Sequence, residues 1–167
     1  MWGFLVLDPF FIYKRHYFCD DWFMTKKSMV VVLGIVENKK GEILLSLRHD
    51  PKFPGAHLKW DLVGGTNEMG ESLEKTLKRE ALEESGLKIA VKKLMPHCIC
   101  KNWNLPDYFQ HTLVFCYDCR KISGKLICRD HKIKELRWAK PEEALKADLI
   151  FSARIFLKMY LEEKVVK

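Results

Sequence analysis

Residues 64–87 read GGTNEMGESLEKTLKREALEESGL, and the fold prediction starts from this stretch. A glycine pair opens it, a segment rich in glutamate follows, and Ser85-Gly86 closes it with a typical helix-stop signal. The pattern predicts a glycine turn that leads into an acidic helix. Such a turn and helix can form a site for a metal ion and phosphate groups.

A helical projection at about 100° per residue places the acids relative to an apolar stripe. Leu73, Leu77 and Ala81 form that stripe. An ordinary surface helix keeps its acids on the opposite face. Three acids instead overlap or flank the stripe here: Glu80, Glu83 and Glu84. Desolvation and mutual repulsion are unfavourable there without a cation, so the spacing predicts a hard divalent ion, Mg²⁺ or Mn²⁺.

Two further glutamates have an ordinary explanation. Glu71 and Glu74 stand four residues before Lys75 and Lys78, which is the spacing of solvated ion pairs on a helix surface.

The same stretch resembles a known family signature. Gly65, Glu71 and the run REALEESGL at 79–87 match the Nudix box, GX5EX7REUXEEXGU, in which U is aliphatic and is represented first by Ala81. The resemblance extends from about Met29 to Glu163, with weaker patterning outside the box. It implies an α/β chain with the Nudix fold, an α/β/α sandwich around a mixed central β-sheet.

The resemblance also implies a role for each box residue. The expected metal ligands are Glu80, Glu83, Glu84 and the carbonyl of Gly64. Arg79 is expected to orient a motif glutamate, and Glu71 is expected to secure the junction between loop and helix. The general base is expected to be Glu83 or Glu84, with Asp130 and Glu135 as the candidates outside the box.

The implied activity is hydrolysis of a nucleoside diphosphate linked to another group, with Mg²⁺ as cofactor and Mn²⁺ as the alternative. The compact chain favours a nucleoside triphosphate pyrophosphohydrolase of the MutT-like kind. An ADP-ribose or nucleotide-sugar pyrophosphatase is the alternative. A non-catalytic Nudix-fold nucleotide-binding module is disfavoured because every box glutamate is present.

Three residues outside the box are candidates for substrate binding. Arg48 ends a predicted strand and could contact a phosphate, although an edge salt bridge explains it equally well. Trp103 and Tyr108 could stack on a base, and the alternative for both is packing in the core or at its rim.

Length, net charge and cysteine content indicate the kinds of partner and site to expect. The 167 residues suit one domain, and the formal net charge of +7 favours anionic partners, phosphates first. No dense basic block with interleaved aromatics is present, so no specific nucleic-acid partner is expected. The cysteines are expected to be reduced thiols of a cytoplasmic protein. For the Cys116–Cys119 pair, packing in the core is favoured over a zinc site, which needs four ligands.

The first 28 residues form an aromatic-rich N-terminal extension, and residues 29–167 form the predicted Nudix hydrolase domain. The extension is too interrupted by charge and proline to cross a membrane. It is interpreted as two short strands or as an arm that packs on the domain or on a second subunit of a homodimer. Met24 as the native start is another alternative.

Hydrophobic periodicity and turn residues predict the remaining elements. Loops are expected at 49–59, 101–107 and 129–134. Strands are expected at 29–37, 42–48, 60–65, 88–100, 108–119, 124–128 and 135–139, and helices at 141–145 and 151–164.

Overall fold

The computed structural model describes residues 25–165, which form a mixed β-sheet and three helices. The strands are β1 (Thr25–Glu37), β2 (Ile43–Arg48), β3 (Trp60–Asp61), β4 (Val63–Thr66), β5 (Lys88–Leu94), β6 (Ile99–Asn104), β7 (Tyr108–Ser123) and β8 (Ile133–Ala139). The helices are α1 (Leu73–Ser85), α2 (Pro141–Ala144) and α3 (Phe151–Val165).

The sheet is organised around β1 and β7. Its main path runs β3-β2-β1-β7-β5, while β4 pairs with β1, β6 with β7 and β8 with β2. The pairing of β1 with β7 is parallel, and the other ladders are antiparallel. This arrangement confirms the predicted mixed sheet.

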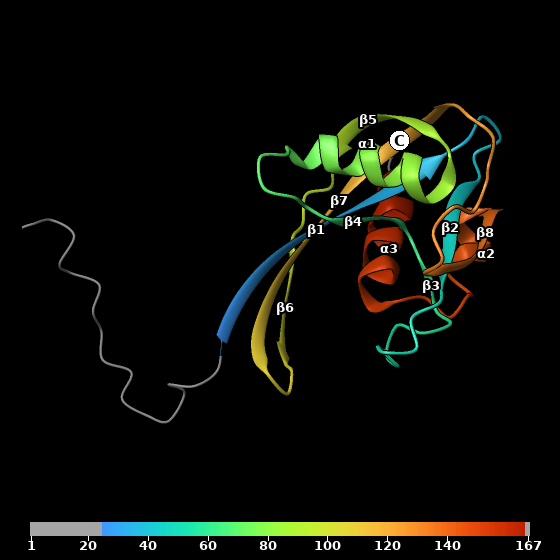
Figure 1. Cartoon of the computed structure of the whole chain (residues 1–167). Coiled ribbons are helices and arrows are strands. Elements are labelled where there is room, and N and C mark those ends of the chain that lie inside the picture. The colour runs from blue at the N-terminus through green and yellow to red at the C-terminus, as the bar shows by residue number, and fades with distance from the viewer. Residues whose placement is uncertain (1–24, 166–167) are drawn as a thin grey trace, which may run out of the picture.

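Alternation along β1 divides its side chains between two hydrophobic cores, as the period of a strand requires. Val32 and Val36 pack with Leu77 of α1 on one face of the sheet. Leu33 and Ile35 pack on the other face, where α3 contributes Ala153, Phe156, Leu157 and Tyr160. Figure 1 shows α1 and α3 on opposite sides of the strands. The three layers are those of the predicted α/β/α sandwich.

Local signals set the ends of α1. The hydroxyl of Ser72 caps the first turn by accepting a hydrogen bond from the Lys75 amide at 3.3 Å. Gly86 ends the helix in the left-handed conformation, with φ of 71°. The helix therefore spans almost all of the acidic segment, and Glu71 lies just before it.

Several of the predicted boundaries differ from the structure, and the larger differences lie in β1, β5 and β6. β1 starts at Thr25 rather than Met29, because residues 25–28 continue in register along β7. The predicted strand 88–100 is two strands, separated at residues 95–98. β6 then continues to Asn104, so Trp103 lies on a strand and the loop predicted at 101–107 begins later.

The strand predicted at 124–128 was wrong. The segment 124–132 forms no strand, and it contacts the C-terminal end of α1 instead. The amide of Ile127 donates to the carbonyl of Ser85 at 3.0 Å, and that of Arg129 donates to the carbonyl of Glu84 at 3.3 Å. These hydrogen bonds replace the ladder that a strand would need.

Other predictions have separate outcomes. The predictions for residues 1–24, which include a packing arm and Met24 as the native start, lie outside the described residues. Cys116 and Cys119 are both buried in the core, as expected for packing thiols. Of the helices between residues 25 and 165, none combines the length and hydropathy needed to cross a membrane.

Candidate active site

The glycine pair allows the acids of α1 to lie against β4. The Gly64 amide donates a hydrogen bond to Glu84 Oε2 at 3.1 Å. A Cβ at Gly65 would overlap the Glu80 carboxylate, and one at Gly64, whose φ is 147°, would overlap the carbonyl of Val32. The backbone excludes a side chain at Gly64, whereas a side chain at Gly65 would displace the Glu80 carboxylate, so the glycine pair brings Glu80 and Glu84 to the backbone of β4.

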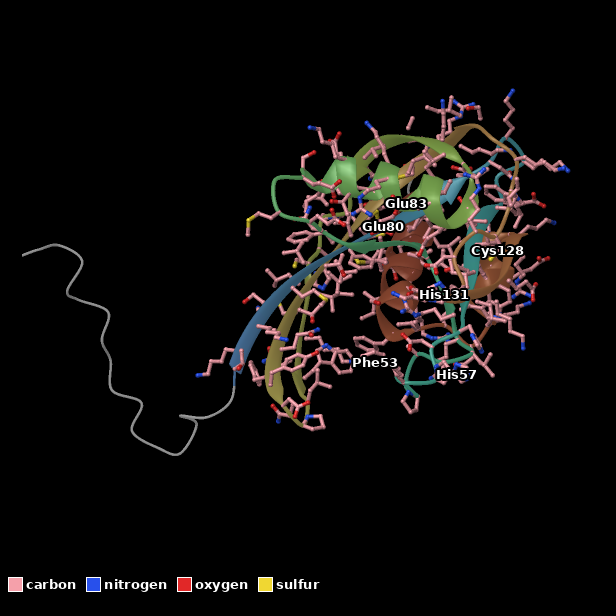
Figure 2. All side chains as sticks on the ribbon, in the orientation of Figure 1. Phe53, His57, Glu80, Glu83, Cys128 and His131 are labelled. Atoms are coloured by element: carbon pink, nitrogen blue, oxygen red, sulfur yellow. The ribbon has the colours of Figure 1, made fainter. Side chains whose placement is uncertain are left out.

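Arg79 connects the other box acids. Its Nε and Nη2 donate to the two carboxylate oxygens of Glu71 at 3.0 and 3.1 Å, which is the bidentate geometry typical of arginine. Its Nη1 contacts Glu80 Oε1 at 2.9 Å and Glu83 Oε2 at 3.2 Å. The guanidinium therefore restrains three carboxylates at once. Figure 2 labels Glu80 and Glu83 on α1.

Glu71 is fixed from a second side. The Thr76 hydroxyl donates to Glu71 Oε2 at 2.9 Å, and the Asn67 amide group donates to the Glu71 carbonyl at 3.2 Å. Hydrogen bonds from Arg79 and then Thr76 hold the pKa of Glu71 below its usual value. Glu71 lies before the first residue of α1, so the i,i+4 spacing of a helix does not apply to it. It forms its ion pair with Arg79, and the predicted pair with Lys75 was wrong.

Several carboxyl groups near Gly64 interact with one another electrostatically. Burial raises the pKa of Glu84 to about 8, and repulsion from Glu80, Asp61 and Asp130 adds to this effect. Burial also raises the pKa of Glu80, against the opposing charge of Arg79. Glu80, Glu84, Asp61 and Asp130, which we call the acid cluster, therefore favour a bound cation or proton.

The chemistry of the acid cluster fits a hard divalent cation, because Mg²⁺ and Mn²⁺ take oxygen ligands. Across residues 25–165, no three His, Cys, Asp or Glu side chains are already gathered as a ready-made cage. Arg79 Nη1 instead lies between Glu80 and Glu83. The predicted ligand set of Glu80, Glu83, Glu84 and the Gly64 carbonyl remains an expectation that this donor chemistry supports.

The three predicted substrate residues lie in two places. Arg48 adjoins the acid cluster, with Nη1 at 3.8 Å from Asp61 Oδ2 and Nη2 at 3.6 Å from Asp50 Oδ2. Trp103 is 42% exposed on β6. Tyr108 starts β7, and the hairpin of these two strands extends away from the helices (Figure 1). An ion pair connects Arg48 to the cluster. Lys101 instead lies over the Trp103 ring and Lys27 over the Tyr108 ring, each at 4.0 Å from the ring centroid.

The structure separates the two base candidates outside the box. Asp130 lies in the segment that contacts the end of α1, and its charge acts on Glu80 and Glu84. Glu135 lies on β8 opposite Leu47 and is exposed. Asp130 is therefore the better placed of the two.

Sequence reasoning missed Asp61 as a site residue. It lies on β3, just ahead of the glycine pair, and is buried at 7% exposure. Its carboxylate Oδ1 accepts the Leu62 amide at 2.8 Å, and burial raises its pKa to about 6. An acid within an otherwise apolar strand next to the box was the available signal.

We expect Asp61 to make the stability of the cation-free protein depend on pH. Because its folded pKa of about 6 exceeds the ordinary aspartate value of 3.8, the folded chain holds a proton that the unfolded chain has released in that interval. Stability should therefore fall by on the order of 2 kcal/mol as pH rises from about 4 to about 6, with no further decline from Asp61 above that.

Urea unfolding with a chelator present measures this decline. Asp61→Asn removes the titration while keeping an oxygen for the Leu62 amide, so the decline should become smaller in the variant. An equal decline in wild type and variant would contradict the assignment of the pH dependence to Asp61.

The chain is similar in sequence and fold to known proteins. The NUDIX domain family matches residues 27–160. A nucleoside triphosphatase NudI from Klebsiella pneumoniae is 29% identical over 140 residues, which cover 80% of this chain and 96% of that protein. The solution structure of the E. coli ORF135 protein is 26% identical, with a TM-score of 0.63, covering 85% of this chain and 94% of that one.

A further solved structure is similar in fold alone. The NUDIX domain of Shewanella oneidensis NrtR, solved in complex with ADP ribose, is 17% identical with a TM-score of 0.64 and covers 83% of this chain and 90% of that one. The family match spans most of the chain, and the residues of the Nudix box lie within the matched range. The chain therefore belongs to the Nudix family of hydrolases.

Proposed function

We propose that the chain is a Mg²⁺-dependent nucleoside triphosphate pyrophosphohydrolase. The observation that carries this proposal is the acid cluster beside Gly64, formed by a complete Nudix box together with Asp61 and Asp130. The similarity to proteins named nucleoside triphosphatase supports the substrate class, because it covers 80% of this chain and 96% of each of two such proteins.

In the proposed reaction a water oxygen attacks one phosphorus of the polyphosphate. A new P–O bond forms, the bond to the bridging oxygen breaks, and the leaving phosphate keeps that electron pair. The water proton passes to a carboxylate, for which Glu83, Glu84 and Asp130 are the candidates. A bound divalent cation would neutralise phosphate charge and lower the pKa of water.

The residues of this chain have separable tasks in that scheme. Glu80, Glu83 and Glu84, with the Gly64 carbonyl, would hold the cation. Arg79 keeps Glu80 and Glu83 oriented through its 2.9 and 3.2 Å contacts. Trp103, which is 42% exposed, would contribute to base stacking at the edge of the sheet, and Tyr108 would do so beside it.

A substrate panel with Mg²⁺ or Mn²⁺ tests the proposal. We expect kcat/KM for nucleoside triphosphates to exceed that for ADP-ribose and nucleotide sugars by about tenfold, with release of a nucleoside monophosphate and pyrophosphate. A preference for ADP-ribose or a nucleotide sugar would instead support the alternative pyrophosphatase. Nucleotide binding without turnover would support a binding module.

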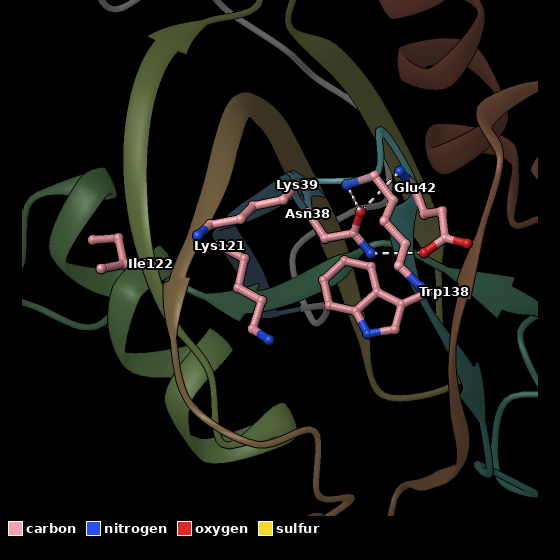
Figure 3. A pocket seen from close by; sticks show the side chains of 7 residues that line it. Asn38, Lys39, Glu42, Lys121, Ile122 and Trp138 are labelled. Carbon is pink, nitrogen blue, oxygen red and sulfur yellow. Dashed lines mark hydrogen bonds between the residues drawn. The ribbon is translucent and has the colours of Figure 1, made fainter.

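Pocket geometry alone does not identify this site. A hollow of about 510 Å³ is lined by residues of the β1–β2 turn together with Lys121, Ile122 and Trp138, as Figure 3 shows. It lies at the end of β2 that pairs with Ala139, whereas Arg48 lies at the other end. The candidate site is therefore defined by the acids and their contacts.

A further inference from the structure

A polar hollow of about 280 Å³ lies next to Arg48, between the loop that follows β2 and the segment that leads into the start of β8. It is lined by His49, His57, Leu58, His131 and Lys134, which we call the histidine hollow. A backbone hydrogen bond joins the two segments. The His49 amide donates to the Lys132 carbonyl at 2.6 Å. Four of the five lining side chains carry nitrogen, and none is an acid.

Hydrogen bonding fixes the character of one of these imidazoles. The Asp50 amide donates to His57 Nδ1 at 3.1 Å, so this nitrogen is an acceptor. The proton of the neutral ring must then lie on Nε2, which makes His57 a donor at that atom. The ring of His49 lies at a centroid distance of 5.4 Å. Among the ion pairs formed within residues 25–165, none includes Lys134.

The hollow adjoins the acid cluster through two contacts. His131 Nδ1 lies 3.4 Å from Asp130 Oδ1. Arg48 bridges Asp50 and Asp61 at 3.6 and 3.8 Å, and its buried Nε has no hydrogen-bond partner in the described chain. In Figure 2, His131 lies between the box glutamates and His57. The acid cluster, which suits a cation, therefore lies next to the nitrogen donors of the histidine hollow, which suit an anion.

We propose that the histidine hollow binds the terminal phosphates of the substrate and selects a polyphosphate tail over an uncharged group linked to the nucleoside diphosphate. This inference rests on the proposed function, since it places the cleaved phosphates at the acid cluster. Phosphate oxygens accept hydrogen bonds from imidazole and ammonium donors. Leu58 is the only aliphatic residue among the five that line the hollow, and the nitrogen donors of the other four favour a phosphate ligand.

Kinetics of Lys134→Gln and His131→Ala test this subsite. Each variant should raise KM for a nucleoside triphosphate by about tenfold, while kcat stays within about twofold, because uniform binding is lost. KM for ADP-ribose should not change. Lys132→Gln is the matched control, since it removes the same charge two residues away from a side chain that does not line the hollow. An equal shift in the control, or for both substrates, would overturn the inference.

Binding of inorganic tripolyphosphate separates failure of the subsite from failure of the proposed function. Wild type should bind it more tightly than Lys134→Gln and His131→Ala by about tenfold, in a measurement that needs no turnover. If wild type binds tripolyphosphate in this way but hydrolyses no triphosphate, the proposed function fails and the subsite stands. If turnover is normal and the variants match wild type in both measurements, the subsite fails alone.

Discussion

Replacing Glu83 with glutamine is expected to reduce Mg²⁺-dependent turnover by about 10²–10⁴-fold, whether this carboxylate holds the cation or accepts the water proton. Its side chain is 60% exposed, and its contact with Arg79 Nη1 can be kept by the amide oxygen of glutamine. The change therefore removes the charge with little effect on packing. Initial rates at saturating substrate across a Mg²⁺ titration measure the loss.

The matched control for Glu83→Gln is Glu74→Gln. Glu74 is exposed in the first turn of the same helix, so the control makes the same charge change away from the acid cluster. We expect the control to retain turnover within about twofold of wild type. The free energy of unfolding of both variants should lie within about 0.5 kcal/mol of the wild-type value. Full turnover of Glu83→Gln, or an equal loss in Glu74→Gln, would rule out the proposed site.

A second measurement separates binding of the cation from chemistry. Mg²⁺ that binds the folded chain raises its free energy of unfolding by RT ln(1 + [Mg²⁺]/Kd). If Glu83 is a ligand, Mg²⁺ should raise the unfolding midpoint of wild type and of Glu74→Gln more than that of Glu83→Gln. A full shift in Glu83→Gln combined with lost turnover would indicate that Glu83 is the base and not a ligand.

The acidic helix could be predicted because its information is local. Ser72, Gly86 and the 3.6-residue period fix where α1 starts, where it ends and which side is buried. The same period placed Glu80 and Glu84 at the edge of the apolar stripe, and the structure has both half-buried against the glycine pair. The helical angle grouped Glu83 with these two acids, but its side chain is 60% exposed in the structure. The angle of a residue on the helix does not show how far the neighbouring strand β4 extends along it.

Residues contributed by distant segments could not be predicted in this way. Asp61 and Asp130 come from β3 and from the segment before β8, and the tertiary fold brings them beside α1. Apolar residues at 124–128 resembled a strand, although their amides bond to the end of α1. Trp103 was placed in a loop, since its strand exists only because β7 provides a partner.

The second large effect is expected at Arg79, whose substitution should lower both activity and stability. Arg79→Ala leaves Glu71, Glu80 and Glu83 without the guanidinium that contacts all three. We expect turnover to fall by about 10²-fold or more, because the acids lose their orientation. The thermal midpoint should fall by about 5 °C, since the carboxylates keep their negative charge without a counterion.

Arg79→Lys separates charge from geometry at this position. Lysine keeps the positive charge but cannot make the paired 3.0 and 3.1 Å hydrogen bonds to Glu71 together with the contacts to Glu80 and Glu83. It should recover most of the lost stability and little of the turnover. Lys78→Ala, on the exposed side of the same helix, is the control and should match wild type in both measurements. If Arg79→Lys is fully active, a positive charge is sufficient and the planar fork has no role in positioning the acids.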